Sequence, residues 1–479
     1  MKKTFSVIVA LVLVVGVAWV GSSWWFSRQV ESRYRQLVAR AAHLSGAEID
    51  VESYQRGLRS STARTRIVIP APQAKDGAFP KLEFTVINEI VSGPFPGGAA
   101  GWRPALALVR SQVALGHDLL KIVRKELPAF PDVLPLASTT IVYFGGNGES
   151  WTSAPALRQT LGDSDPITVD WQGLKGHSTF KAGFAECRGD WQMPALEVTA
   201  KTGRLKLSGL GSTFDMHLPQ GPEGLVLGNF EYGLKGLDFT DSDEKDGKGL
   251  NFALQDLAFK SSSWETEGLV NAILRASFRS LTVAGAVYGP GVYDMQITNF
   301  DGEALHEMQQ LSRGLREEPG LSPQQMQTQM LAGIGKLWPR FAACSPGIEI
   351  RDLSVQGPDG HLHCTGKVAI DGSNKAALAS PLLLPNAITA QASLDISAQM
   401  LRKMVAAVIR EQLVKARAAS GQPPLPEQRL DALAAANSDQ GVTAMVEKHI
   451  LVPNGDSYTL SASYKPGAAT LNGQPIPLH

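Results

Sequence analysis

The most chemically suggestive residues of this chain are two histidines and a cysteine in the run His361-Leu362-His363-Cys364. Alternate residues of a β-strand point to the same face, so both imidazoles would lie on one face and the thiol on the other. Two imidazoles form only part of a zinc site, because protein-bound zinc needs three or four ligands. We therefore interpret them as exposed or hydrogen-bonded strand histidines, and we predict no metal site and no cofactor.

The acidic run from Asp241 to Gly247 superficially resembles a calcium-binding loop. Lys245 occupies a ligand position, and the glutamate that should close such a loop is not at the required spacing. A solvated, charged turn is the favoured interpretation. The run Asp163-Ser164-Asp165-Pro166 is likewise typical of a turn.

The motifs that mark common enzyme classes are missing from the sequence. It contains no Gly-x-Ser-x-Gly elbow, no His-Glu-x-x-His helix and no phosphate-binding Gly-x-x-x-x-Gly-Lys loop. Cys187 has no base beside it, and a bridge between Cys344 and Cys364 is one open alternative for the three cysteines. We predict no catalytic residues, although a triad assembled from distant residues needs no local motif.

The elements that would position these side chains are mostly β-strands. Apolar and polar residues alternate over many short runs, and glycine-containing turns separate them at intervals that suit hairpins and meanders. No strand-plus-crossover-helix unit recurs, so a parallel sheet is not expected. The expected strands include residues 49–54, 60–69, 82–88, 141–144, 167–171, 196–200, 205–208, 214–218, 224–230, 250–259, 274–283, 293–298 and 348–355.

Amphipathic helices are expected at a few places only. Apolar side chains recur at helical spacing, and Ser322 with Pro323 forms a plausible helix start. The favoured interpretation of these stripes is core packing or a helix hairpin against a sheet, and a lipid- or partner-facing groove is the alternative. The expected helices are residues 30–44, 118–127, 302–316, 322–341, 397–419 and 427–436.

Residues Phe5 to Phe26 contain no charge and are long enough to cross a bilayer of roughly 30 Å. Lys2 and Lys3 precede this run, which favours a cytoplasmic N-terminus and export of the body. A cleavable signal peptide ending near residue 18 is the alternative. Tryptophans near the end of the run favour an uncleaved anchor, whose marker residues are Phe5, Trp19, Trp24, Trp25 and Phe26.

The composition indicates a folded body with no general attraction for polyanions. Lys plus Arg and Asp plus Glu number 45 each, and 43% of residues are hydrophobic. We therefore expect no nucleic-acid partner. The predicted fold class is α+β, mostly antiparallel β: elongated meandering sheets with a few amphipathic helices after one N-terminal transmembrane helix. The predicted domains are the anchor at 1–28, a β-rich region at 29–300 and a helix-containing β region at 301–479.

Several short motifs together resemble those of one protein family. They are Tyr54-Gln55-Arg56-Gly57 with Ser60-Ser61, the segment Asn88 to Pro96, Phe300 to Ala304, Ser393 to Ser397, and Tyr464 with Gly467 and Thr470 to Gln474. Together with the apolar leader, they resemble the YdgA-like family of bacterial envelope proteins, whose function is unknown. The resemblance implies an inner-membrane protein with a periplasmic body, and it implies no catalytic residues. In one departure, Ser92 stands where relatives often carry histidine.

The family-motif positions are predicted to be architectural. Gly57 is expected to adopt a positive φ or to allow a close backbone approach. Pro94 and Pro96 hold Phe95 in an extended segment, with a buried corner favoured over a ligand pocket. The Asn472-Gly473 pair predicts a hairpin turn. The full set is Tyr54, Arg56, Gly57, Asn88, Glu89, Gly93, Pro94, Phe95, Pro96, Asn472 and Gly473.

The leading function hypothesis is a noncatalytic envelope protein that binds a protein partner or an apolar, lipid-like ligand. A continuous apolar groove would support it, and a filled sandwich core would count against it. A cell-envelope hydrolase is the first alternative and predicts a polar pocket with converging carboxylates or histidine. The second is a self-associating scaffold that uses an edge strand or the stripe from Met326 to Phe341. The expected partners are thus the bilayer through residues 5–26, an envelope protein or lipid, and a second copy of the chain.

Overall fold

The computed structural model describes residues 25–42, 47–69, 82–98, 101, 103–126, 130–162, 165–217, 224–241, 251–317, 321–378, 383–423 and 425–477. The chain divides into two compact units. Unit 1 comprises Met1–Tyr232 with Thr240–Gly249, and unit 2 comprises Gly233–Phe239 with Leu250–His479. The predicted boundary between residues 300 and 301 stays a prediction.

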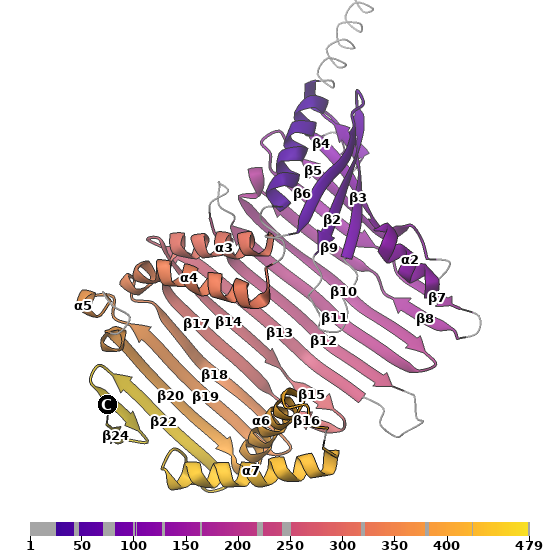
Figure 1. Cartoon of the computed structure of the whole chain (residues 1–479). Helices are drawn as coiled ribbons and strands as arrows, with labels where there is room; N and C mark the ends of the chain where they lie inside the picture. The colour runs from indigo at the N-terminus through magenta and orange to yellow at the C-terminus, as the bar shows by residue number, and fades with distance from the viewer. Residues whose placement is uncertain are drawn as a thin grey trace, which may run out of the picture. The chain divides into compact units, whose positions relative to one another are not determined.

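Unit 1 is built on an antiparallel sheet in which most neighbouring strands are consecutive in sequence (Figure 1). The order is β1–β2–β3–β4–β5–β6–β9–β10–β11, and β7 and β8 extend from the second half of β10. Its strands are β1 (Glu48–Gln55), β2 (Ser60–Ile69), β3 (Leu82–Ser92), β4 (Ala107–Leu115), β5 (Val133–Val142), β6 (Gly148–Ala154), β7 (Leu157–Leu161), β8 (Ile167–Trp171), β9 (Leu174–Phe180), β10 (Glu186–Ala200) and β11 (Gly203–His217). Strand β12 (Leu227–Asp241) contributes residues to both units.

A helix formed by residues 25–42 packs on one face of the first strands of unit 1. Val30 lies in a fully buried cluster with Ala63, Ile90 and Ala107 from β2, β3 and β4. Small residues such as Ala63, which is 0% exposed, let the helix approach the sheet closely. A second helix, α2 (His117–Glu126), follows β4 as its apolar spacing predicts.

The strands of unit 2 are antiparallel and pair in the order β13–β14–β17–β18–β19–β20–β22–β23–β24. The short pair β15–β16 extends from β13, and β21 pairs with β22. Its strands are β13 (Asn251–Thr266), β14 (Leu269–Phe278), β15 (Ser280–Val283), β16 (Ala286–Tyr288), β17 (Gly291–Asp301), β18 (Gly347–Gly357), β19 (Gly360–Ile370), β20 (Ile388–Ser397), β21 (Val452–Asn454), β22 (Ser457–Lys465), β23 (Ala468–Leu471) and β24 (Gln474–Ile476). The single strand expected at 274–283 is wrong, because the strand is interrupted at Arg279. On the side away from β13, β14 pairs with β17 and β15 pairs with β16.

The helices of unit 2 form two pairs and one short turn. Helix α3 (Gly302–Glu317) packs with α4 (Pro323–Ala343), α6 (Ala398–Ala419) packs with α7 (Glu427–Glu447), and α5 is Lys375–Leu378. The predicted end of α7 at Ala436 is wrong. Ser438 is buried and donates to the Arg402 carbonyl at 2.7 Å, and Val442 is 2% exposed, so packing against α6 outweighs the weak helix propensity of this segment.

The predicted α+β, mostly antiparallel class is confirmed, because the pairings β1–β2, β10–β11, β14–β17, β19–β20 and β20–β22 are all antiparallel. Most of the predicted anchor, including Phe5, Trp19 and Trp24, lies outside the described residues. Trp25 and Phe26 form the first turn of the helix at 25–42. Within the described residues, no helix combines the length and apolarity needed to span a bilayer.

Candidate functional site

One face of the unit 2 sheet is apolar across successive strands. Ile297, Ile348, Val368, Ala390 and Tyr464 stand directly opposite one another on β17, β18, β19, β20 and β22. Residues paired in register share a face, so this row lies on one side of the sheet. A parallel row two residues along the strands contains Met295, Ile350, Gly366, Ala392 and Ala462. We call these two rows, with Ala469 and Ile476 of the closing hairpin, the apolar face.

Part of the apolar face is open to solvent. Ile348 is 45% exposed, Val368 is 48% exposed and Ile476 is 43% exposed. A hollow of about 420 Å³ lies over these strands, and Ile348, Val368 and Tyr464 are among its lining residues. Side chains that alternate with the two rows point to the other side, where Glu349 and Lys367 form an ion pair at 3.1 Å. The sheet therefore has one apolar and one polar face.

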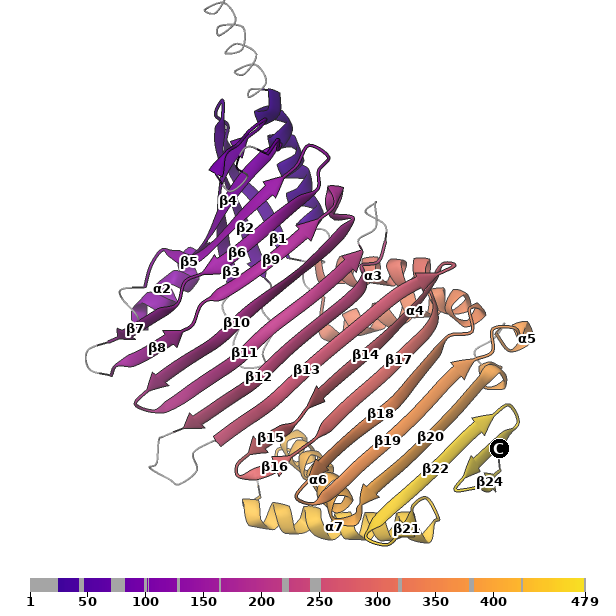
Figure 2. The same cartoon turned by 180° about the vertical axis from the view of Figure 1, so that it is seen from behind.

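The helix pairs of unit 2 both lie on the apolar face. Phe300 of β17 contacts Phe341 of α4, with ring centroids 5.9 Å apart. At the other end of the strands, a Cβ built on Gly357 would lie 3.3 Å from Met400 of α6. Figure 1 views the sheet from the helix-bearing side, and Figure 2 shows the strands of unit 2 in front of α3 and α4. The open apolar surface thus lies between two helical borders.

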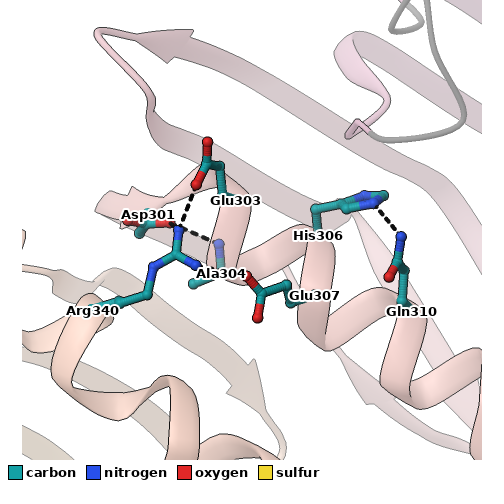
Figure 3. Close-up of polar contacts among 7 residues, drawn as sticks. All are labelled: Asp301, Glu303, Ala304, His306, Glu307, Gln310 and Arg340. Carbon is teal, nitrogen blue, oxygen red and sulfur yellow. Dashed lines mark hydrogen bonds and ion pairs between the residues drawn. The ribbon is translucent and has the colours of Figure 1, made fainter.

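Arg340 fixes one of these borders. Its guanidinium contacts carboxylate oxygens of Asp301 at 2.8 Å, Glu303 at 2.9 Å and Glu307 at 2.6 Å, so it joins α4 to the start of α3 (Figure 3). Asp301 Oδ1 also accepts from the Ala304 N–H at 2.7 Å and so caps α3. The three carboxylates raise the pKa of Arg340 against the opposing effect of desolvation. The motif from Phe300 to Ala304 therefore forms the junction between β17 and α3.

The amphipathic helices bury only part of their apolar stripes. In α4, Leu337 and Phe341 form a buried cluster with Ala304, which confirms core packing for that part of the predicted stripe. In α6, by contrast, Met404 is 47% exposed and Val408 is 55% exposed. Apolar side chains are therefore exposed on a bordering helix as well as on the sheet.

The early family-motif residues meet the helix of unit 1. Arg56 pairs with Glu31 at 3.6 Å, and the Gly57 carbonyl accepts from the buried Ser27 hydroxyl at 3.0 Å. The ring of Tyr54 lies 5.9 Å from that of Tyr34. We call this set of contacts the docking seam. Its residues hold residues 25–42 against the sheet, which is an architectural role.

A chain of buried and half-buried polar groups extends the docking seam into the sheet. Asn88 donates to the Tyr34 hydroxyl at 2.7 Å and accepts from Ser111 at 2.6 Å, while the Tyr34 hydroxyl also contacts Thr65 Oγ1. Desolvation raises the pKa of the Tyr34 phenol above its usual value near 10, so the neutral phenol is favoured. The sequence marked Asn88 through the family resemblance but gave no signal for its partner Ser111.

The segment from Gly93 to Pro96 is a corner, as expected. A Cβ on Gly93 would lie 2.0 Å from the Ala105 carbonyl oxygen, so only glycine fits there. The Gly93 N–H donates to Leu106 at 2.6 Å, Pro96 is buried and Phe95 is half-buried. Ser92 is 1% exposed and its hydroxyl has no partner within the part of the chain that the structure describes.

The remaining motif positions are a close backbone approach, an exposed ion pair and a hairpin turn. Gly57 does not adopt a positive φ, but a Cβ there would lie 2.1 Å from the Ser60 oxygen, so the close-approach alternative is the correct one. Glu89 is exposed and pairs with Arg110 at 3.5 Å on the other face of β3. Asn472 and Gly473 form the predicted turn, both with positive φ, and Asn472 Oδ1 accepts from the Ser461 N–H at 2.8 Å.

The two histidines on β19 do not converge on a shared ligand position. His361 Nδ1 lies 3.0 Å from Ser397 Oγ and Nε2 lies 3.2 Å from Asp395 Oδ1, whereas His363 lies 3.8 Å from Asp352. Within the described residues, no group of three potential metal ligands is found.

Ser397, His361 and Asp395 have the composition and the hydrogen-bond order of a catalytic triad. The Ser397 hydroxyl also accepts from the His361 backbone N–H at 2.9 Å, and a Cβ on Gly360 would lie 2.1 Å from it. The hydroxyl, which lies at the start of α6, thus packs against the β18–β19 turn. We interpret its role as stabilising that turn. No distant partner for Ser397 was visible in the sequence.

Cys187, Cys344 and Cys364 are free thiols. Burial raises the pKa of the Cys187 thiol, which the charge of Arg40 opposes, and burial also raises the pKa of Cys344. Neither thiol is activated as a nucleophile by these surroundings. Of the calcium-like run, only Asp241 lies within the described residues.

Comparison with known proteins gives a match over the whole chain. The family model described as "Bacterial protein of unknown function (DUF945)" matches residues 1–479. Protein YdgA of Escherichia coli (strain K12) is 22% identical over 384 residues, which cover 74% of this chain and 72% of that protein. No solved structure matches the chain.

Proposed function

The chain belongs to the DUF945 family of bacterial proteins of unknown function, as its resemblance to YdgA predicted, and from this premise we propose that it is a membrane-anchored envelope protein that shields lipid acyl chains on the apolar face of unit 2. The uncharged run 5–26 would hold the chain in the inner membrane, with its body in the periplasm. In this role the protein binds its ligand without chemical change.

The observation that carries the proposal is the open part of the apolar face. A single sheet layer with Ile348 and Val368 nearly half exposed costs free energy in water, because each exposed apolar square ångström forgoes about 25 cal/mol of burial. A ligand that covers this surface recovers that free energy. An acyl chain fits because the surface is apolar along several strands and carries its charged pair, Glu349 and Lys367, on the other face.

The borders of the surface support a long, narrow ligand. The pairs α3–α4 and α6–α7 stand at opposite ends of the strands on the apolar face, so the open surface runs across the strands between them (Figure 1). Met404 and Val408 of α6 add exposed apolar side chains.

The test is recovery of lipid with the full-length protein. We would purify it from native membranes in a mild detergent and quantify bound acyl lipids by mass spectrometry. The double variant Ile348→Asn/Val368→Asn is expected to lower the recovered lipid at least fivefold, which corresponds to about 1 kcal/mol. The matched control Glu349→Gln/Lys367→Gln changes neighbouring residues that face the other way and should retain lipid.

Equal recovery from both double variants would overturn the proposal. Recovery of no acyl lipid with the unaltered protein would do the same. A stable protein partner that is lost only from the Ile348/Val368 variant would reassign the apolar face to protein binding.

A further inference from the structure

A second apolar hollow lies in unit 1, beside the docking seam. It has a volume of about 340 Å³, is partly open, and is lined by the helix at 25–42, strands β3, β4 and β5, and the segment that follows β9. Small-molecule sites occupy roughly 300–1,000 Å³, so this hollow is at the lower end of that range. Its apolar lining includes Val30, Leu37, Ile90, Val109, Val142 and Phe180.

The charged side chains that line this hollow all have the same sign. They are Arg33 and Arg40, and no Asp or Glu occurs among the described lining residues. The two arginines are seven residues apart, which is about two helical turns and places them on one face of the helix. The helix thus presents two positive charges to a mostly apolar hollow, which Tyr34 and Gln36 also line.

Both guanidinium groups reach from the helix towards glycines on the opposite side. A Cβ built on Gly183 would lie 3.1 Å from Arg40 Nη1, and one built on Gly146 would lie 3.8 Å from Arg33 Nη1. Both glycines have positive φ, so these turns disfavour a side chain that would fill the space beside each arginine. Guanidinium groups bind carboxylates and phosphates through paired hydrogen bonds.

We propose that this hollow binds a single-chain anionic amphiphile, with the acyl chain among the apolar lining and the acidic head group at Arg33 and Arg40. The volume equals about eleven water molecules at roughly 30 Å³ each, and a methylene group is similar in size. One chain of about ten to twelve carbons has a similar volume. The proposal is independent of the apolar face of unit 2, because the two surfaces share no residue.

The test uses photoactivatable dodecanoic acid as the probe with full-length protein in a neutral detergent. Adducts are mapped by peptide mass spectrometry, and three twelve-carbon competitors are compared: dodecanoate, dodecyl phosphate and dodecanol. We expect adducts in peptides that contain the lining residues. At least one of the two anions should compete ten times better than dodecanol, and the stronger anion identifies a free fatty acid or a phosphorylated single-chain lipid as the source.

Two variants and one control locate the site. Arg33→Gln/Arg40→Gln should weaken labelling at least tenfold, whereas Arg35→Gln, whose guanidinium pairs with Glu31 at 3.2 Å outside the hollow, should not. Val109→Phe fills the space from the sheet side and should also reduce labelling.

Equal competition by dodecanol, adducts confined to other peptides, or labelling that persists in both lining variants would each overturn the proposal.

Discussion

The two units of this protein differ in how far their helices cover the strands. In unit 1, residues 25–42 lie directly on the first strands, and Ile90 beneath them is fully buried. In unit 2, the helices stand at the two ends of the strands, and Ile348 between them is 45% exposed. A helix that covers a sheet therefore buries its apolar side chains, whereas helices that only border a sheet leave apolar side chains exposed.

The largest expected effect compares these two isoleucines directly. Ile90→Ala removes buried methyl groups and leaves a cavity, so it should lower the free energy of unfolding by about 3 kcal/mol. Ile348→Ala removes a half-exposed side chain and should cost less than about 1 kcal/mol. Urea unfolding of the full-length protein in a mild detergent measures both. Similar costs would contradict the contrast between a covered and an open face.

The next effect concerns the polar groups under the helix of unit 1. Asn88→Ala leaves the Tyr34 and Ser111 hydroxyls without their shared partner in a buried position, at a cost of about 2 kcal/mol. Hydrogen exchange should show faster opening of residues 25–42. The control Glu89→Ala changes the neighbouring exposed residue and should have little effect on either measurement.

A smaller effect is expected on the polar face of unit 2. Ser397→Ala removes the hydroxyl that accepts from the His361 N–H, and it should cost about 1 kcal/mol by loosening the β18–β19 turn. A fluorophosphonate probe for activated serines should not label the unaltered protein at Ser397. Labelling that His361→Ala abolishes would instead identify a catalytic serine and support the hydrolase alternative.

The smallest effect is the pH dependence of unit 1. Burial raises the pKa of Tyr34 in the folded state above its unfolded value near 10, so the folded state retains the proton more strongly. The stability linked to this group is complete below pH 10 and is lost as the pH rises through the folded pKa. Tyr34→Phe should therefore make thermal unfolding less sensitive to pH above about 10. An unchanged pH profile would indicate that this phenol is not protected.

Much of the fold could be predicted from local patterns. The strand at 60–69 and the helices at 118–127 and 302–316 carry clear periodicity, and the structure has β2, α2 and α3 at nearly the same positions. Strands β6 and β9 were not predicted, because they lack the alternation of apolar and polar residues. Glycine, serine and threonine occupy many of their positions, as in Gly148-Glu149-Ser150-Trp151 and Gly176-His177-Ser178-Thr179. Their pairing depends on neighbours distant in sequence, which local patterns do not reveal.

The candidate sites were harder to predict than the fold. Ile348 and Val368 each belong to a strand in which apolar and polar residues alternate. Only the register of five strands shows that the apolar residues of these strands lie opposite one another on one face. Arg33 and Arg40 read as ordinary surface residues of a helix until Gly146 and Gly183 are placed opposite them. His361 drew attention by its type, whereas its contacts with Asp395 and Ser397 follow from strand pairing.

The most direct test of the open apolar face is photocrosslinking in living cells from two adjacent positions on β19. A photoreactive p-benzoylphenylalanine would replace Val368, which points to the apolar face, or Lys367, which points to the polar face. We predict lipid adducts at residue 368 and none at residue 367. Adducts at both positions, or at neither, would contradict the assignment of this surface to acyl chains.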